Sequence, residues 1–228
     1  MSGIHELLKR RIIMGAYSAG EPLSQLSVAQ ELGISRTPLR EVFRLLEQEG
    51  LILSEHNKRF RVADSSPEDL EELYSLRITH EAAAARISVP HLGSHDLARL
   101  TDLLAEMDSA ADEEAYDRWH DPHSAFHRHL LVHSGRRHLE IAQQLSDHAE
   151  RYRYASTLPS NPASWSAGRR DHHALLEAAA IGDGEEVART LAAHYGRVAL
   201  SVLSISAPLH DPRTLRLTLN HDGLPVPS

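Results

Sequence analysis

Four of the seventeen histidines in this chain have spacings that could bring their imidazoles together. His123 and His127 are four residues apart, which places them about 40° apart around a helix. His172 and His194 each lie 11 residues from Asp183, in the turn between two predicted helices. Four imidazoles converging inside a helical bundle would form a divalent transition-metal site. Spacing alone leaves another interpretation open, in which the histidines are scattered over the surface.

Three arginines form a second group with a regular spacing. Arg36, Arg40 and Arg44 are each four residues apart, so they share one face of a helix. Exposed cations in such a row suit the phosphates and base edges of DNA. The stripe also fits a solvated helix face on which Arg44 pairs with Glu41 or Glu47, so the surrounding elements must decide.

The stripe lies within residues 23–50, which predict two helices joined by a tight turn. Gly33 supplies the turn, Ser35 suits the N-cap of the second helix, and Gly50 suits the position just after its end. The buried side of the second helix is expected to consist of Leu39, Val42, Leu45 and Leu46. Two helices in this arrangement, with cations on the second, are typical of a helix-turn-helix that binds DNA.

The flanking segments extend this motif. Residues 4–13 predict an amphipathic first helix, and residues 17–22 predict a connection containing Gly and Pro. After the second helix of the motif, residues 51–53 and 60–62 predict two short strands around a polar loop. Three helices followed by a hairpin make a winged helix-turn-helix.

The rest of the chain predicts helices throughout. We expect them at residues 67–87, 94–111, 122–133, 137–155, 167–181 and 184–204. Asp121 suits the N-cap of the third of these, with Pro122 as its first residue. Short connections between the helices indicate an antiparallel bundle. The fold class is therefore mostly α, with an N-terminal winged helix-turn-helix at 1–64 and a C-terminal antiparallel α-helical bundle at 65–206. Residues 207–228 are expected to form a loose C-terminal extension, in which the alternating Leu215, Leu217 and Leu219 could pair with another segment.

Charge is distributed unevenly between these parts. The whole chain has a net charge of −8. Residues 1–64 carry 9 basic and 8 acidic side chains, net +1, and residues 65–228 carry 15 and 24, net −9. The acidic excess therefore does not exclude a nucleic-acid partner for the first part.

Composition narrows the remaining possibilities. The absence of cysteine excludes disulfides and thiolate zinc sites. No apolar run is long enough to cross a membrane, and the N-terminus lacks a signal-peptide pattern, so we expect a cytoplasmic protein without a membrane partner.

Residues 4–62 resemble the DNA-binding domain of the GntR superfamily of bacterial regulators. The resemblance lies in the turn at 20–23, the run LGISRTPLRE at 32–41, and the residues at 46–47 and 49–51. It implies DNA contacts from Arg36, Thr37 and Arg40. The predicted DNA-binding set also includes Arg44 and the wing cations Lys58 and Arg59. Arg59 stands where the family usually has Gly, so either the wing turn differs or Arg59 adopts a strained backbone.

Residues 67 to about 200 resemble the FCD ligand-binding domain. In metal-binding members the ligands look like an Asp and a His four residues apart, followed by two further His. His127, His172 and His194 match those histidines, and His123 stands at the Asp position. The motif register favours His172 over its neighbour His173 as the inward-facing residue. The resemblance implies a divalent transition metal held by an all-histidine set, with Zn or Ni preferred over hard ions.

These features predict a homodimeric transcription regulator, most simply a repressor, that binds a near-palindromic double-stranded operator. A small carboxylate effector at the metal would alter operator affinity, with Arg77 as its bidentate partner. Arg77 could instead pair with Glu81, four residues away. The alternative function is a metal-responsive or metal-stabilised regulator without an organic ligand. An enzyme is not expected, because the chain lacks the His-Glu-x-x-His and Glu-x-x-His patterns.

Overall fold

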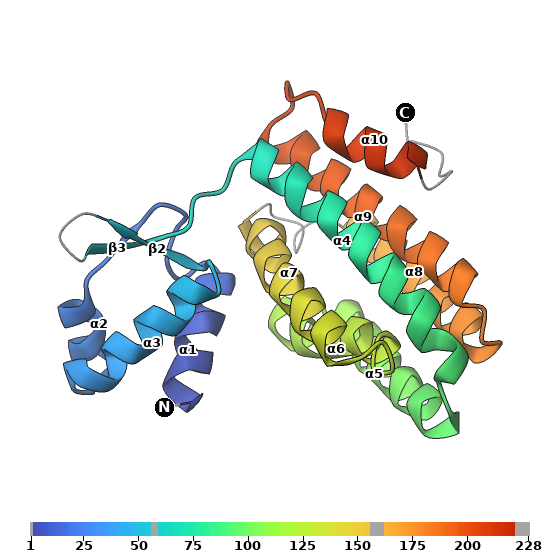
Figure 1. The fold of residues 1–228 in the computed structure, drawn as a ribbon, viewed down its shortest axis with the longest axis horizontal. Helices are drawn as coiled ribbons and strands as arrows, with labels where there is room; N and C mark the ends of the chain where they lie inside the picture. The colour runs from blue at the N-terminus through green and yellow to red at the C-terminus, as the bar shows by residue number, and fades with distance from the viewer. Residues whose placement is uncertain (1, 56–58, 156–161, 222–228) are drawn as a thin grey trace. The chain divides into compact units, whose positions relative to one another are not determined.

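The computed structural model describes residues 2–55, 59–155 and 162–221. It divides into two compact units (Figure 1). The first extends to Ser66 and includes the short segment Glu150–Ala155, and the second begins at Pro67.

The first unit is a winged helix-turn-helix. Its elements are α1 Ser2–Ile13, β1 Pro22–Leu23, α2 Gln25–Leu32, α3 Arg36–Gln48, β2 Ile52–Glu55 and β3 Arg59–Val62. The three strands form an antiparallel sheet in the order β1-β3-β2. The third strand, β1, was not predicted, because two residues are too few for a period-2 pattern to be recognised.

Local sequence explains the sharp turns around α2 and α3. The Ser24 hydroxyl accepts a hydrogen bond from the Ser27 amide and so caps α2. Gly33 ends that helix with φ 64°, and Gly50 follows α3 with φ 74°. Both values lie in the left-handed region that glycine adopts without a steric cost. The turns therefore form where the glycines predict them.

The core of the first unit differs in one position from the expected side of α3. Leu45 is 40% exposed, and Phe43 is only 1% exposed. Phe43 packs edge-on against Phe60 of β3, with ring centroids 5.1 Å apart. Residues 39, 42, 43 and 46 follow the i, i+3, i+4, i+7 spacing of a single helix face, and residue 45 falls beside that face. The prediction for Leu45 was therefore wrong, and Phe43 was missed.

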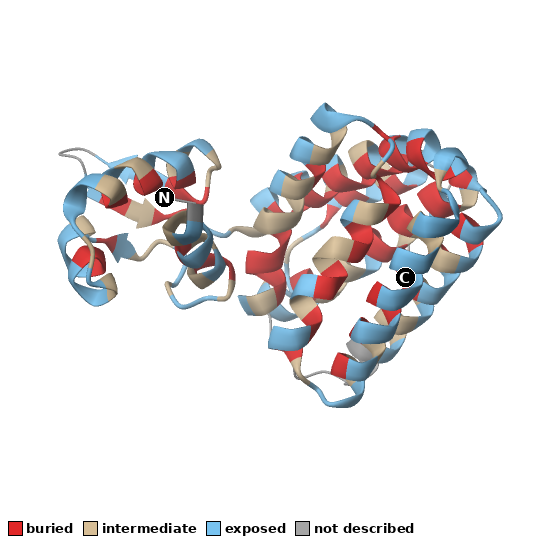
Figure 2. Ribbon diagram, turned by 90° about the horizontal axis from the view of Figure 1, so that it is seen from below, coloured by how far each residue is buried: buried red, intermediate tan, exposed pale blue. Residues whose placement is uncertain are grey.

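The second unit is an antiparallel bundle of helices. They are α4 Pro67–Ser88, a short 3₁₀ turn Val89–His91, α5 Ser94–Asp112, α6 Tyr116–Leu130, α7 Arg136–Ala155 (of which Glu150–Ala155 belongs to the first unit), α8 Pro162–Ala180, α9 Gly184–Ser206 and α10 Arg213–His221. Figure 2 shows buried residues on the facing sides of these helices. Helices α4 and α9 lie alongside each other. A Cβ at Gly184 would come within 3.2–3.4 Å of the backbone at Ala85 and Arg86, so glycine permits this close approach.

Helix α6 begins earlier than the sequence predicts. It starts at Tyr116 and contains Pro122 in its interior, so Asp121 is not its N-cap. Tyr116 and Trp119 are both buried, and they continue the face formed further along by Phe126. Burial of these aromatic rings outweighs the loss of the backbone hydrogen bond that proline cannot make.

The described part of the C-terminal extension contains a helix, α10, which the sequence did not predict. In α10, Leu215 and Leu219 are buried, whereas Leu217 is exposed. The spacing that matters is therefore i, i+4 on a helix, not strand alternation. Leu219 lies against Gly196 of α9, where an added Cβ would come within 3.0 Å of the leucine side chain. No helix in the described ranges is long and apolar enough to cross a membrane.

Candidate metal centre and nucleic-acid interface

The predicted DNA-contacting residues of α3 lie on its solvent side. Arg36, Thr37, Arg40 and Arg44 are all exposed. Arg44 Nη1 lies 3.3 Å from a Glu41 carboxylate oxygen, and Arg40 Nε lies 3.6 Å from the same oxygen. Arg36 has no ion pair with any described residue. Exposed ion pairs of this kind are worth little, so they leave the arginines available to an anionic partner.

The wing shows how the chain accommodates an arginine at the expected glycine position. Arg59 is exposed and begins β3, where it pairs with Glu55 across the hairpin. Among described residues other than glycine, only Glu114 has a positive φ. Arg59 therefore lies in extended backbone without strain. Lys58 lies outside the described residues.

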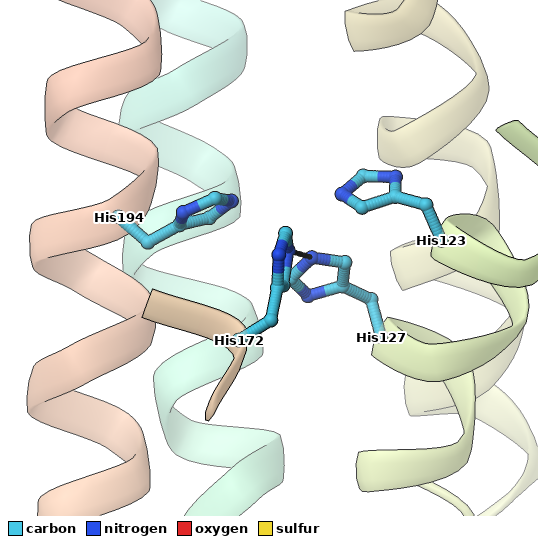
Figure 3. A group of neighbouring side chains, drawn as sticks. All are labelled: His123, His127, His172 and His194. Atoms are coloured by element: carbon cyan, nitrogen blue, oxygen red, sulfur yellow. Dashed lines mark hydrogen bonds between the residues drawn. The ribbon is translucent and has the colours of Figure 1, made fainter. Parts of the chain in front are cut away.

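The structure brings the four predicted histidines together in the second unit (Figure 3). His123 and His127 come from α6, His172 from α8 and His194 from α9. Each is at most 4% exposed. The neighbouring His173 is exposed instead, and its Nε2 lies 2.8 Å from Asp108 Oδ2.

The ring nitrogens form a set that fits a transition-metal ion. One nitrogen from each histidine lies within 4.8 Å of the other three. His127 Nε2 and His172 Nε2 are 3.1 Å apart. This is close to the separation of two nitrogens on one tetrahedral Zn²⁺, whose Zn–N bonds are about 2.0–2.1 Å. The His123 ring stacks on Trp119 at a centroid distance of 4.0 Å, which holds it in the cluster.

A carboxylate orients His194 from outside the cluster. His194 Nδ1 lies 2.9 Å from Asp171 Oδ2, and Arg197 pairs with the other carboxylate oxygen. Burial raises the pKa of Asp171, but hydrogen bonds from His194 and Arg197 outweigh it and lower that pKa to about 2. The ionised carboxylate therefore accepts the Nδ1 proton of His194. This leaves Nε2 of His194 as the lone-pair donor to a metal.

A longer buried chain of hydrogen bonds orients His127. The Tyr195 hydroxyl donates to Glu81 Oε2 over 2.5 Å, and it lies 3.1 Å from His127 Nδ1. Burial raises the pKa of Tyr195 well above its ordinary value, so the phenol keeps its single proton. Because that proton goes to Glu81, the phenol oxygen accepts the Nδ1 proton of His127. Nε2 of His127, which faces His172 Nε2, is then the nitrogen that would bind a metal.

Arg77 stands at the far end of this chain. Its Nε donates to Glu81 Oε1 over 2.7 Å, and its guanidinium lies 4.0 Å from the centroid of the Tyr195 ring. Burial lowers the pKa of Arg77, but Glu81 together with Tyr195 and Tyr74 raises it by more, so the guanidinium stays charged. Arg77 Nη2 is buried and has no hydrogen-bond partner among the described residues. The structure thus places Arg77 in the alternative ion pair, behind His127.

The sequence interpretation missed Asp171 and Tyr195, although each is adjacent to a predicted ligand. Neighbouring residues on a helix point about 100° apart, so neither can support the histidine beside it. Asp171, next to His172, instead contacts His194 of α9. Tyr195, next to His194, contacts His127 of α6. The position of each residue next to a predicted ligand was the only sequence signal. It identifies the supporting contact only once the packing of the three helices is known.

Comparisons with known proteins find a family match for each of the two parts of the chain. A family model described as "Bacterial regulatory proteins, gntR family" matches residues 1–62, and one described as "FCD domain" matches residues 72–197. The uncharacterized HTH-type transcriptional regulator YdhC of Bacillus subtilis (strain 168) is 30% identical over 134 residues, covering 58% of this chain and 60% of that protein. The match therefore spans less than two thirds of that relative.

Two further matches cover more of the relatives concerned. The HTH-type transcriptional repressor GlaR of Escherichia coli (strain K12) is 28% identical over 152 residues, 64% of this chain and 69% of that protein. The solved structure of E. coli McbR/YncC has a TM-score of 0.80 at 23% identity, covering 89% of this chain and 96% of that one. At this identity the structural likeness establishes the fold.

Proposed function

This chain belongs to the GntR family of bacterial regulatory proteins and carries an FCD domain, and from this premise we propose that it is a repressor whose affinity for operator DNA changes when a small organic acid binds at a metal ion. It is a DNA-binding transcriptional regulator. GntR regulators bind DNA operators, and FCD domains bind small-molecule effectors. Repression is proposed because GlaR is named a repressor.

The DNA half of the proposal assigns operator recognition to α3. Arg36, Thr37 and Arg40 would contact base edges, and Arg44 with the wing cations Lys58 and Arg59 would contact phosphates. A homodimer would place two such helices about one turn of DNA apart on a near-palindromic site. Exposure of the four α3 side chains supports this assignment.

The effector half rests mainly on one observation, the convergence of four buried histidines with their outer partners already in place. His123, His127, His172 and His194 would hold a divalent transition metal, with Zn or Ni suited to an all-imidazole set. Such a metal would supply a cationic Lewis acid that attracts a small carboxylate. Binding of the acid would shift the population of conformations that fit the operator.

The test compares two adjacent histidines. Wild type, His172→Ala and His173→Ala are exchanged into zinc or nickel, desalted and analysed for metal content. We expect about one ion per chain in wild type and His173→Ala, and loss in His172→Ala, because only His172 is in the cluster. Equal metal content in all three proteins would overturn the metal site.

The same three proteins test the effector. Affinity for operator DNA is measured by fluorescence anisotropy across a panel of small organic acids. At least one acid should change the affinity of wild type and His173→Ala while leaving His172→Ala unchanged. If no acid changes the affinity of the metal-loaded wild type, the effector half fails.

The alternative, a regulator that the metal stabilises without any organic ligand, is favoured by one observation. The cavity beside His127 has a volume of only about 10 Å³, room for about one water. In that case chelation lowers the melting temperature and weakens operator binding, and no acid has a further effect.

A further inference from the structure

A second group of metal-binding side-chain types lies where the beginning of α5 meets the end of α6. Asp96 is in the first turn of α5. His129 is in the last turn of α6, and His133 lies four residues further on, in the turn that follows the helix. Nε2 of His129 lies 3.3 Å from Oδ1 of Asp96, and Nε2 of His133 lies 3.0 Å from Oδ2. One carboxylate therefore lies between two imidazoles.

This group is separate from the four-histidine cluster. His129 is two residues beyond His127, which places the two side chains about 200° apart around α6. His127 points into the cluster with His172, whereas His129 points towards α5. An ion held by His129 would therefore not share a ligand with an ion in the cluster.

Local contacts hold the group in place. Asp96 Oδ2 accepts a hydrogen bond from the Gly93 amide over 3.0 Å, and the His133 amide donates to Ser88 Oγ over 3.0 Å. The hydrogen bonds from His133 and Gly93 lower the pKa of Asp96 to about 2. The carboxylate is therefore ionised and fixed at the start of α5.

The His129 ring has a nitrogen without a partner. Its Nε2 is buried and makes no hydrogen bond to any described residue, although a carboxylate oxygen of Asp96 is near. A buried ring nitrogen that lacks a partner costs free energy. A cation placed beside Asp96 would supply that partner, because a neutral imidazole donates a lone pair to a metal.

A similar contact elsewhere in the second unit shows what distinguishes Asp96. Nε2 of His173 lies 2.8 Å from Oδ2 of Asp108, but the other oxygen of Asp108 accepts a hydrogen bond from Arg169. That carboxylate has one imidazole and a fixed positive charge. Asp96 has two imidazoles, and no arginine or lysine pairs with it in the part of the chain that the structure describes.

The ligand types and their exposure indicate what would bind. Two imidazoles and a carboxylate suit divalent transition metals such as zinc and nickel. The side chains of Asp96, His129 and His133 are 17%, 21% and 40% exposed, so water has access to complete the coordination. The two rings contact different oxygens of Asp96, so they must rotate towards each other to hold one ion.

We propose that Asp96, His129 and His133 form a second divalent transition-metal site, completed by water. It binds more weakly than the four-histidine cluster, because it has three protein ligands and is open to solvent. An ion there ties the start of α5 to the end of α6, the helix that carries His123 and His127. The inference does not rest on the proposed function, since neither DNA nor an organic acid takes part.

The test is an equilibrium zinc titration of the metal-free full-length chain, in competition with a chromogenic chelator. Equilibrium is needed because desalting removes a weakly bound ion. Wild type should bind two ions in two steps, and His172→Ala should keep the weaker step. His133→Gln and Asp96→Asn should each keep the tighter step and weaken the other about 100-fold, because each removes one of three protein ligands.

His173→Gln is the matched control for His133→Gln. The two histidine side chains are 48% and 40% exposed, and each places Nε2 near one carboxylate. His173→Gln should bind both ions like wild type. The melting temperature gives a second readout: zinc should raise it in His172→Ala, through the remaining site, and leave it unchanged in the double variant His172→Ala, His133→Gln.

The outcomes separate the two metal sites. A single ion in wild type that is lost in His172→Ala and kept in His133→Gln overturns the second site and leaves the cluster intact. A single ion that is lost in His133→Gln and kept in His172→Ala supports the second site and overturns the cluster. A weaker step that survives both His133→Gln and Asp96→Asn belongs to other residues and overturns this assignment.

Discussion

The arginine face of α3 and the histidine cluster of the second unit differ in how their residues are assembled. The arginines fall within residues 36–44 and point into solvent. The histidines lie between residues 123 and 194, come from three helices and are buried. The arginine face is complete as soon as a single helix forms, whereas the histidine cluster exists only when the bundle has packed.

The two regions also differ in the residues that contact their functional side chains. Around α3 the arginines have at most exposed, weak ion pairs, so their charges are satisfied mainly by water until a partner arrives. Behind the histidines, Asp171 and Glu81 are each held by an arginine and direct one imidazole. Substitutions on α3 should therefore change binding without changing stability, and substitutions behind the histidines should change both.

The largest expected effect is on DNA binding. Replacing Arg36 and Arg40 by Ala removes two predicted base contacts per chain, each worth about 1–3 kcal/mol. Four contacts in a two-chain complex give a loss of roughly 1,000-fold or more, so anisotropy with operator DNA should fall to the non-specific level. Thermal stability and metal content should stay at wild-type values.

Arg44→Ala is the comparison variant for that measurement, because Arg44 already pairs with Glu41. It should weaken binding only several fold and reduce the salt slope of the two-chain complex by about 2, as expected for one phosphate contact per chain. Equal losses for Arg44→Ala and the double variant would remove the distinction between base and phosphate contacts. Unchanged operator binding in the double variant would overturn the role of α3.

The contrast between the two regions also explains what the sequence could predict. On α3 the motif is contiguous, so Gly33, Ser35 and Gly50 locate the turn and the helix directly. For the histidines, spacing within α6 and around Asp183 suggested four of the seventeen but left a scattered surface set open. The resemblance to the FCD domain favoured the four, and the structure brings them together.

Features that depend on tertiary packing could not be predicted from the sequence pattern. Nothing local indicates that a helix would continue through Pro122, because the compensation comes from buried aromatic rings. The helix α10 depends on Gly196 of another helix. The link from Arg77 through Glu81 and Tyr195 to His127 joins three helices, and a pairwise i, i+4 rule finds only its first step.

The second expected effect tests burial with two ion pairs of identical spacing. Arg77–Glu81 and Arg136–Glu140 are both i, i+4 pairs, but the side chains are 2% and 3% exposed in the first and 77% and 59% in the second. Arg77→Met should lower the free energy of unfolding by about 3–5 kcal/mol, since Glu81 is left buried and unpaired. Arg136→Met should change it by about 0.5 kcal/mol or less.

Urea unfolding of the metal-free proteins measures both values. The double variant Arg77→Met, Glu81→Leu should recover much of the loss, because it removes the unpaired charge. Similar stabilities for Arg77→Met and Arg136→Met would contradict the contrast between a buried, prearranged region and an exposed one.

The smallest expected effect concerns how firmly the outer groups hold a metal ligand. Tyr195→Phe removes the hydroxyl between Glu81 and His127, so His127 loses the acceptor that fixes its Nδ1 proton. Loss of such an outer contact typically lowers metal affinity 10- to 100-fold. Zinc affinity is measured by competition with a chromogenic chelator at constant pH, because imidazole ligands also bind protons.

Tyr74→Phe is the control, since Tyr74 is an equally buried tyrosine whose ring packs against Tyr195. If the Tyr195 hydroxyl acts only through general packing, both variants lose stability and neither loses zinc selectively. If it orients His127, Tyr195→Phe alone binds zinc more weakly, and the difference persists after correction for metal-free stability. That second outcome would show that the contrast between the two regions also holds for the residues that orient the histidines. Within the described residues, no comparable group orients Arg36 of α3.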